Sequence, residues 1–111
     1  MKFLNQIENA FTKTTSTTTA DQVLDTFSAT SYIGAKYLIH VVSGTSMHFT
    51  EIMLVYYSVT PAALMSEYGT IVSNSALATF TADISSGSVR LLVTPVNAST
   101  TYKIIRSVMP A

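Results

Sequence analysis

From residue 22 to the C-terminus, this chain is a series of short runs of alternating or β-branched apolar residues. Clusters of turn-forming residues at 43–46, 73–75, 85–87 and 95–98 separate them. Runs that start about every 8 to 14 residues are typical of an antiparallel β-sandwich or jelly roll. We therefore predict an all-β, sandwich or jelly-roll-like domain. Its predicted strands cover residues 22–29, 36–42, 47–57, 67–72, 79–84, 89–93 and 101–108.

The first 20 residues differ from this pattern. Phe3, Leu4, Ile7 and Phe11 recur at helical spacing and predict a short amphipathic helix over residues 3–11. The Thr-rich stretch that follows, residues 12–19, contains β-branched residues that also suit an edge strand. We interpret residues 1–20 as a helical or extended arm and residues 21–111 as the sandwich domain. The four apolar side chains of the arm are our candidate partner-binding residues.

Several predicted strands are apolar on both faces. In the strand over 47–57, the period of two separates two apolar sets: Met47, Phe49, Met53 and Val55 on one face, and Ile52, Leu54 and Tyr56 on the other. A two-layer sandwich buries only one face of each sheet. The second apolar face therefore requires another partner, and we expect this to be another subunit.

The strand over 89–93 has a simpler pattern. Val89, Leu91 and Val93 share one face and are predicted core residues, whereas Arg90 is expected on the opposite face. Asp83 is likewise expected to point outward.

The composition also favours assembly. Charged residues make up 11% of the chain, against 17 Thr and 14 Ser, and the mean hydropathy is +0.37. Because a typical soluble domain is about 25% charged, we expect a homo-oligomer. The formal net charge of zero gives no attraction to nucleic acid. The longest apolar run, residues 52–57, is too short to span a membrane, and the N-terminus does not fit a signal peptide.

The sequence contains no recognisable catalytic or cofactor motif. Cysteine is absent, no serine lies in a Gly-x-Ser-x-Gly turn, and the four glycines form no phosphate loop. His40 and His48 lie near Glu51 in one predicted hairpin, but strand histidines are more often hydrogen-bonded surface or interface residues than metal ligands. We therefore predict no catalytic residue, no cofactor and no metal site, and a protein that is not an enzyme.

The six tyrosines allow two interpretations. Tyrosine rings can stack on sugars in a host-binding adhesin, or they can serve as core and interface residues. Most of them lie inside the predicted strands rather than in loops, which favours the structural interpretation.

Six segments of the chain, in the same order, resemble a β-rich module found in structural proteins of marine and cyanobacterial tailed phages. They are residues 20–32, 35–37, 50–55, 66–70, 80–84 and 89–95. The resemblance covers about residues 20–108 and leaves the arm outside. It implies a virion component without catalysis, assembled in the host cytoplasm, and it carries no binding-site motif to transfer. For the expected oligomer, a trimer is then the favoured symmetry, because fibres and the three-fold positions of capsids both have it.

For a stand-alone copy of such a module, we expect a capsid decoration or cement protein that contacts other virion proteins such as the major capsid protein. The alternative is a neck, tail-fibre or baseplate-associated module, which could also bind host glycan.

Overall fold

The computed structural model describes residues 8–111, and all regular structure within this range is β-strand. There are eight strands: β1 (Glu8–Thr15), β2 (Gln22–Ser28), β3 (Tyr32–Ser43), β4 (Ser46–Tyr57), β5 (Ala62–Val72), β6 (Ala78–Ser85), β7 (Ser88–Pro95) and β8 (Thr100–Pro110). Each of the seven predicted strands coincides with one of β2 to β8.

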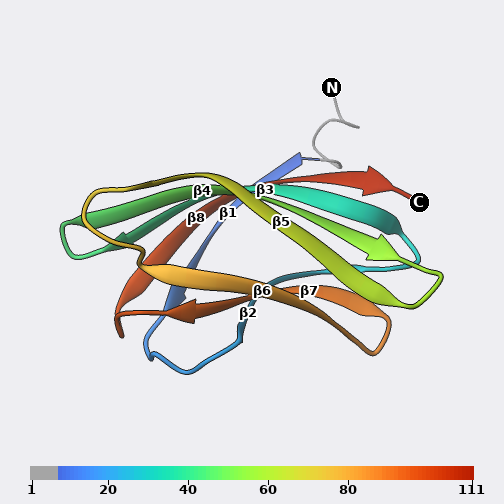
Figure 1. Ribbon diagram of the computed structural model, residues 1–111, viewed down its shortest axis with the longest axis horizontal. Helices are drawn as coiled ribbons and strands as arrows, with labels where there is room; N and C mark the ends of the chain where they lie inside the picture. Colours follow the sequence, from blue (N-terminus) through green and yellow to red (C-terminus); the bar gives the residue numbers. More distant parts are fainter. Residues whose placement is uncertain (1–7) are drawn as a thin grey trace.

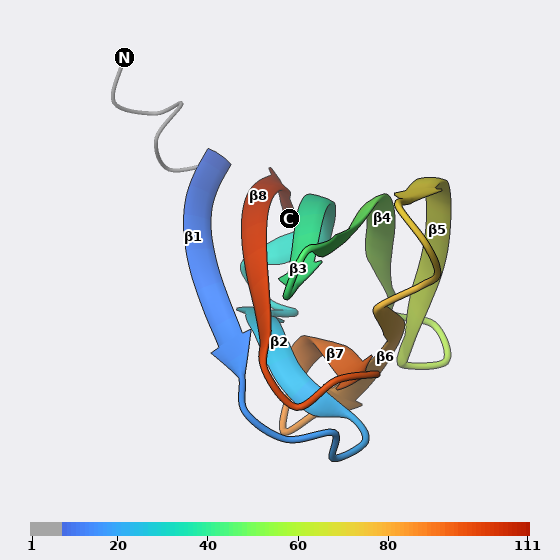
Figure 2. The ribbon, with the colours of Figure 1, turned by 90° about the vertical axis from the view of Figure 1, so that its left-hand side faces the viewer.

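The strands form two antiparallel sheets packed face to face (Figures 1 and 2). One sheet has five strands in the order β1-β8-β3-β4-β5, and the other has three in the order β2-β7-β6. The predicted antiparallel β-sandwich is therefore confirmed. The division into five and three strands keeps the β3–β4–β5 meander within a single sheet.

The core lies between the sheets and draws on both. Val89, Leu91 and Val93 of β7 are at most 1% exposed, as the alternation predicted. They belong to one cluster with inward-facing residues of the larger sheet, among them Ile39 and Ile104. Burying such a set of aliphatic side chains is the main favourable term in the stability of the domain.

Strand β1 corrects one expectation. Residues 8–11 were predicted as the end of a helix, but they begin a strand whose eight residues pair with β8, from Glu8 opposite Ser107 to Thr15 opposite Thr100. A helix this short is marginal in water, whereas the edge of β8 offers unpaired backbone groups to an extended segment. The extended alternative therefore holds over residues 8–15. Phe3, Leu4 and Ile7 lie outside the described residues.

Strand β5 is longer than predicted: it begins at Ala62, whereas the predicted strand covered residues 67–72. It also contains a bulge, because the register of β5 against β4 shifts between Phe49 and Glu51. Gly69 lies in the shifted segment with a φ of +66°, a left-handed conformation that glycine adopts without strain. The bulge breaks the alternation within the recognised second half of the strand, and the missed residues, 62–66, precede it.

Candidate functional site: the outer face of the five-stranded sheet

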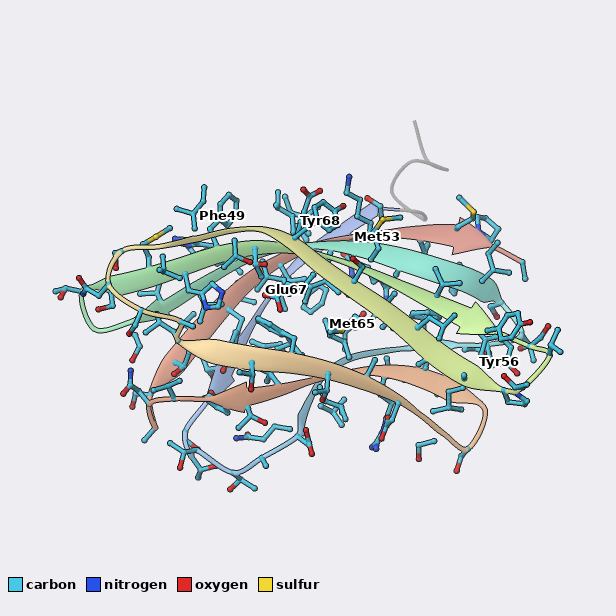
Figure 3. The ribbon with its side chains drawn as sticks, in the orientation of Figure 1. Phe49, Met53, Tyr56, Met65, Glu67 and Tyr68 are labelled. Atoms are coloured by element: carbon cyan, nitrogen blue, oxygen red, sulfur yellow. The ribbon has the colours of Figure 1, made fainter. Side chains whose placement is uncertain are left out.

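The five-stranded sheet turns a largely apolar surface away from the core. Figure 3 shows Phe49, Met53 and Tyr68 pointing away from the three-stranded sheet, whereas Met65 and Glu67 point toward it. We call this surface the outer apolar face. It consists of nine large apolar side chains that are between 37% and 61% exposed: Ile33, Met53, Val55, Tyr57, Leu64, Tyr68, Ile71, Ile105 and Met109.

Alternation in β4 produces this face. Ile52 and Leu54 are fully buried and Tyr56 packs against the core, while Met53 and Val55, between them, are 48% and 42% exposed. The prediction that this strand is apolar on both faces is thus confirmed. Contiguous apolar patches of this kind on soluble proteins mark interaction surfaces.

Two opposite charges within the face neutralise each other. Lys36 of β3 and Glu51 of β4 form an ion pair, with 2.9 Å between Nζ and Oε2. The hydrogen bond to Glu51 raises the pKa of Lys36 above its usual value. The pair therefore adds a fixed polar point to the face without giving it a net charge.

A hollow of about 290 Å³ opens in the face above Gly34. Gly34 lies in β3 between Val55 of β4 and Met109 of β8. Because Gly34 has no side chain, the neighbouring side chains surround an unfilled space, and a Cβ added there would lie 3.0 Å from the carbonyl oxygen of Leu54. The rim of the hollow includes Ile33 and Met53.

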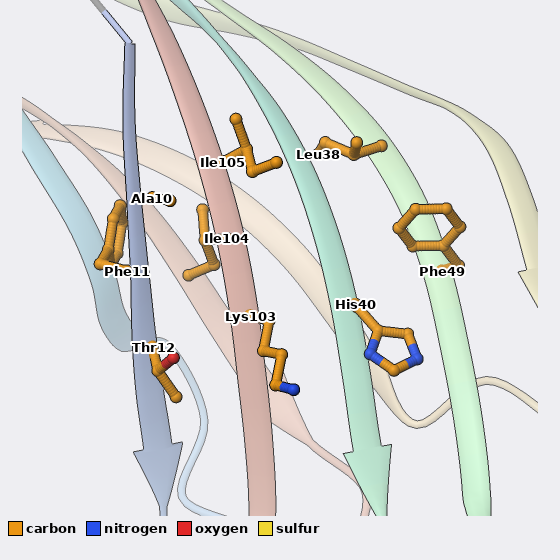
Figure 4. Close-up of a pocket in the computed structure, with 9 residues that line it drawn as sticks. All are labelled: Ala10, Phe11, Thr12, Leu38, His40, Phe49, Lys103, Ile104 and Ile105. Atoms are coloured by element: carbon orange, nitrogen blue, oxygen red, sulfur yellow. The ribbon is translucent and has the colours of Figure 1, made fainter. Parts of the chain in front are cut away.

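A second hollow, of about 350 Å³, lies across β1, β8, β3 and β4, and Figure 4 shows its lining. His40 and Phe49 meet edge to face there, with 5.8 Å between ring centroids. Phe11 lines the same hollow from β1 and also packs against the core. Of the four proposed arm residues, Phe11 thus helps to hold β1 on the sandwich, and its role in partner binding stays a prediction.

His48 has a structural environment that the sequence did not reveal. It is 1% exposed, and its Nδ1 accepts a hydrogen bond of 3.1 Å from the backbone N–H of Leu77. Burial lowers the pKa of His48 below its usual value. Because Nδ1 acts as an acceptor, the neutral ring carries its proton on Nε2, so no ring nitrogen is free to bind a metal. Residues 8–111 contain no group of three or more His, Cys, Asp or Glu residues able to hold a metal ion.

The remaining charged candidates form structural pairs. Asp83 and Arg90 face outward on the three-stranded sheet, joined by two hydrogen bonds of 2.7 and 2.6 Å. All six tyrosines lie in strands, and Tyr57 and Tyr68 are the two whose side chains are more than a third exposed. Both belong to the outer apolar face.

Comparison with solved structures places this fold among known proteins. The crystal structure of the Acinetobacter baumannii phage AM24 tailspike protein matches with a TM-score of 0.60 and 8% sequence identity. The Acinetobacter phage vB_ApiP_P1 tailspike protein matches with a TM-score of 0.60 and 16% identity. At such low identity, the similarity establishes a shared fold.

The matches cover nearly all of this chain but a small part of the tailspikes. They span 94% and 92% of this chain, and 26% and 22% of the two tailspike chains. No protein-family model and no curated protein sequence matches the chain. Within residues 8–111, there is also no helix with the length and hydropathy needed to cross a bilayer.

Proposed function

We propose that this protein is a structural, non-enzymatic component of a bacteriophage virion and that it is associated with the tail. The observation that carries the proposal is the fold: nearly the whole chain has the fold of a segment of two phage tailspike proteins. The earlier resemblance to phage structural proteins points to the same class of particle.

The fold comparison changes the order of our two expectations. Capsid decoration was the first, but both solved structures quoted above are tail proteins. Their support goes to the alternative, a tail-associated module. The large outer apolar face agrees with a part that is built into an assembly, because such a surface is costly to leave in water.

Self-association belongs to this proposal. The chain has few charges and an apolar face on its larger sheet, so copies of it are expected to pack together. A trimer is the favoured symmetry because phage fibres and capsid three-fold positions both have it. Binding of host glycan stays a prediction. Of the six tyrosines considered for it, the two exposed ones, Tyr57 and Tyr68, lie on the same face that we assign to packing.

Immunogold electron microscopy of intact particles tests the location. An antibody raised against residues 21–111 is expected to label the tail or its tip. Labelling distributed over the head would instead support capsid decoration, and the absence of any label on particles would contradict a virion role.

A further inference from the structure

We propose that the outer apolar face binds a second copy of this chain, and that the hollow above Gly34 receives an apolar side chain from that copy. This inference rests on the self-association in the proposed function and assigns the surface and the contact point.

The first argument is area. Nine large apolar side chains are on average about half exposed, and at roughly 150 Å² each, the lower end of the range for an aromatic side chain, they present on the order of 700 Å². A stable protein interface buries about 800 Å² on each partner, and the largest apolar patch on a typical monomer is about 300–600 Å². The outer apolar face is therefore large enough to be one side of an interface.

The second argument is charge. The Lys36–Glu51 ion pair is satisfied within the chain. Lys36 is the charged residue that lines the hollow. The remaining lining side chains, such as Val55 and Met109, carry no charge. A strongly acidic or basic partner would find no complement around this hollow, and an identical copy brings no unpaired charge to it. The exposed Lys103 of β8 lies on the same side of the sheet but lines the other hollow.

The third argument is shape. Met53 and Met109 stand at the rim of the hollow and are 48% and 60% exposed. Their side chains are flexible, unbranched and suited to filling irregular apolar spaces. One face therefore carries both a recess of about 290 Å³ and the projecting side chains that would fill such a recess on a neighbouring copy.

Sedimentation of the full chain from about 1 to 100 µM tests the proposal, with two valine substitutions as a matched pair. Val55→Lys places a charge beside the hollow. Val23→Lys places the same charge at a valine of similar exposure, 48% against 42%, on β2 of the other sheet. The wild type and Val23→Lys are expected to form an oligomer, and Val55→Lys to weaken association at least about tenfold.

A second variant controls for the possibility that Val55→Lys disturbs folding. Met109→Ser shortens a rim side chain near the C-terminal end of β8 without adding charge, and it is expected to weaken association with an unchanged circular dichroism spectrum. If Val55→Lys and Met109→Ser associate as the wild type does, the surface assignment is wrong even if the protein is found on tails. A monomeric wild type would also overturn it. If the wild type is a monomer and associates only after removal of residues 1–7, the proposal is also wrong, because those residues and not a second copy would then occupy the face.

Discussion

The hydroxyl of Tyr37 donates a hydrogen bond of 2.8 Å to Oδ2 of Asp25, and this contact joins the two sheets. Tyr37 belongs to β3 of the larger sheet and Asp25 to β2 of the smaller one. Nη1 of Arg106, from β8, lies 3.1 Å from the same carboxylate oxygen. Burial, reinforced by the nearby Asp25 charge, raises the pKa of Tyr37 far above its usual value, so the phenol remains a donor.

Asp25→Asn should therefore destabilise the fold by about 3 kcal/mol, because it leaves the mostly buried Arg106 without its counter-charge. Asp83→Asn is the matched control, since Asp83 pairs with Arg90 at the surface and its loss should cost much less. Urea unfolding of both variants measures the difference. If both variants lose the same free energy of unfolding, the contact between the sheets contributes no more to stability than the surface pair does.

Leu91→Asp is expected to unfold the domain, and Arg90→Asp is not. Leu91 is fully buried in β7, and an unpaired carboxylate there costs several kcal/mol out of a total stability of about 5–15 kcal/mol. Arg90→Asp loses the surface pair with Asp83 and places two carboxylates side by side, which is a smaller penalty. Thermal melts followed by circular dichroism distinguish them, and similar melts would show that the strand faces are misassigned.

Acid should weaken the fold through His48. Burial holds the pKa of His48 below its usual value of 6.5, so the unfolded chain takes up a proton before the folded one does. The contribution of His48 to the free energy of unfolding is thus complete above about pH 6.5 and declines as the pH falls from there toward the lower folded pKa.

The comparison of His48→Gln with His40→Gln tests this origin. The amide oxygen of glutamine at position 48 can still accept the Leu77 N–H, and this variant should lose less stability than the wild type between about pH 7.5 and pH 5. His40→Gln is the control for the loss of a histidine elsewhere in the larger sheet. If His48→Gln keeps the wild-type pH dependence, another group is responsible.

Removal of residues 1–20 should leave a folded domain that no longer enters particles. β8 would lose β1 but keep its pairing with β3, so the larger sheet retains four strands. The hydrogen bond between Thr15 Oγ1 and Tyr102 Oη and the packing of Phe11 are lost, which should lower the melting temperature. A truncated chain without a cooperative melt would show that β1 is integral to the domain and that the boundary at residue 20 is wrong.

Local patterns were sufficient for the faces of β4 and β7. The alternation at Val89, Leu91 and Val93, and the two apolar faces of β4, follow directly from the period of two and the sandwich architecture. The position of residues 8–11 did not follow, because the spacing of apolar residues predicts a helix whereas the open edge of β8, almost 100 residues later, selects a strand.

The polar contacts between residues far apart in the sequence could not be predicted from sequence patterns either. Asp25 and Arg106 are 81 positions apart, and nothing in either neighbourhood indicates the other. His48 was expected at a surface or interface, but it is buried and accepts a hydrogen bond from Leu77, in the segment before β6. The outer apolar face could be expected from β4, whereas the hollow at Gly34 required the register of three strands.

Quantitative mass spectrometry of separated heads and tails, from purified particles of the phage proposed to encode this chain, tests the central claim most directly. We predict that the chain is recovered with the tail fraction, in a fixed ratio to other tail proteins. Recovery with the heads, in proportion to the major capsid protein, would contradict a tail-associated role.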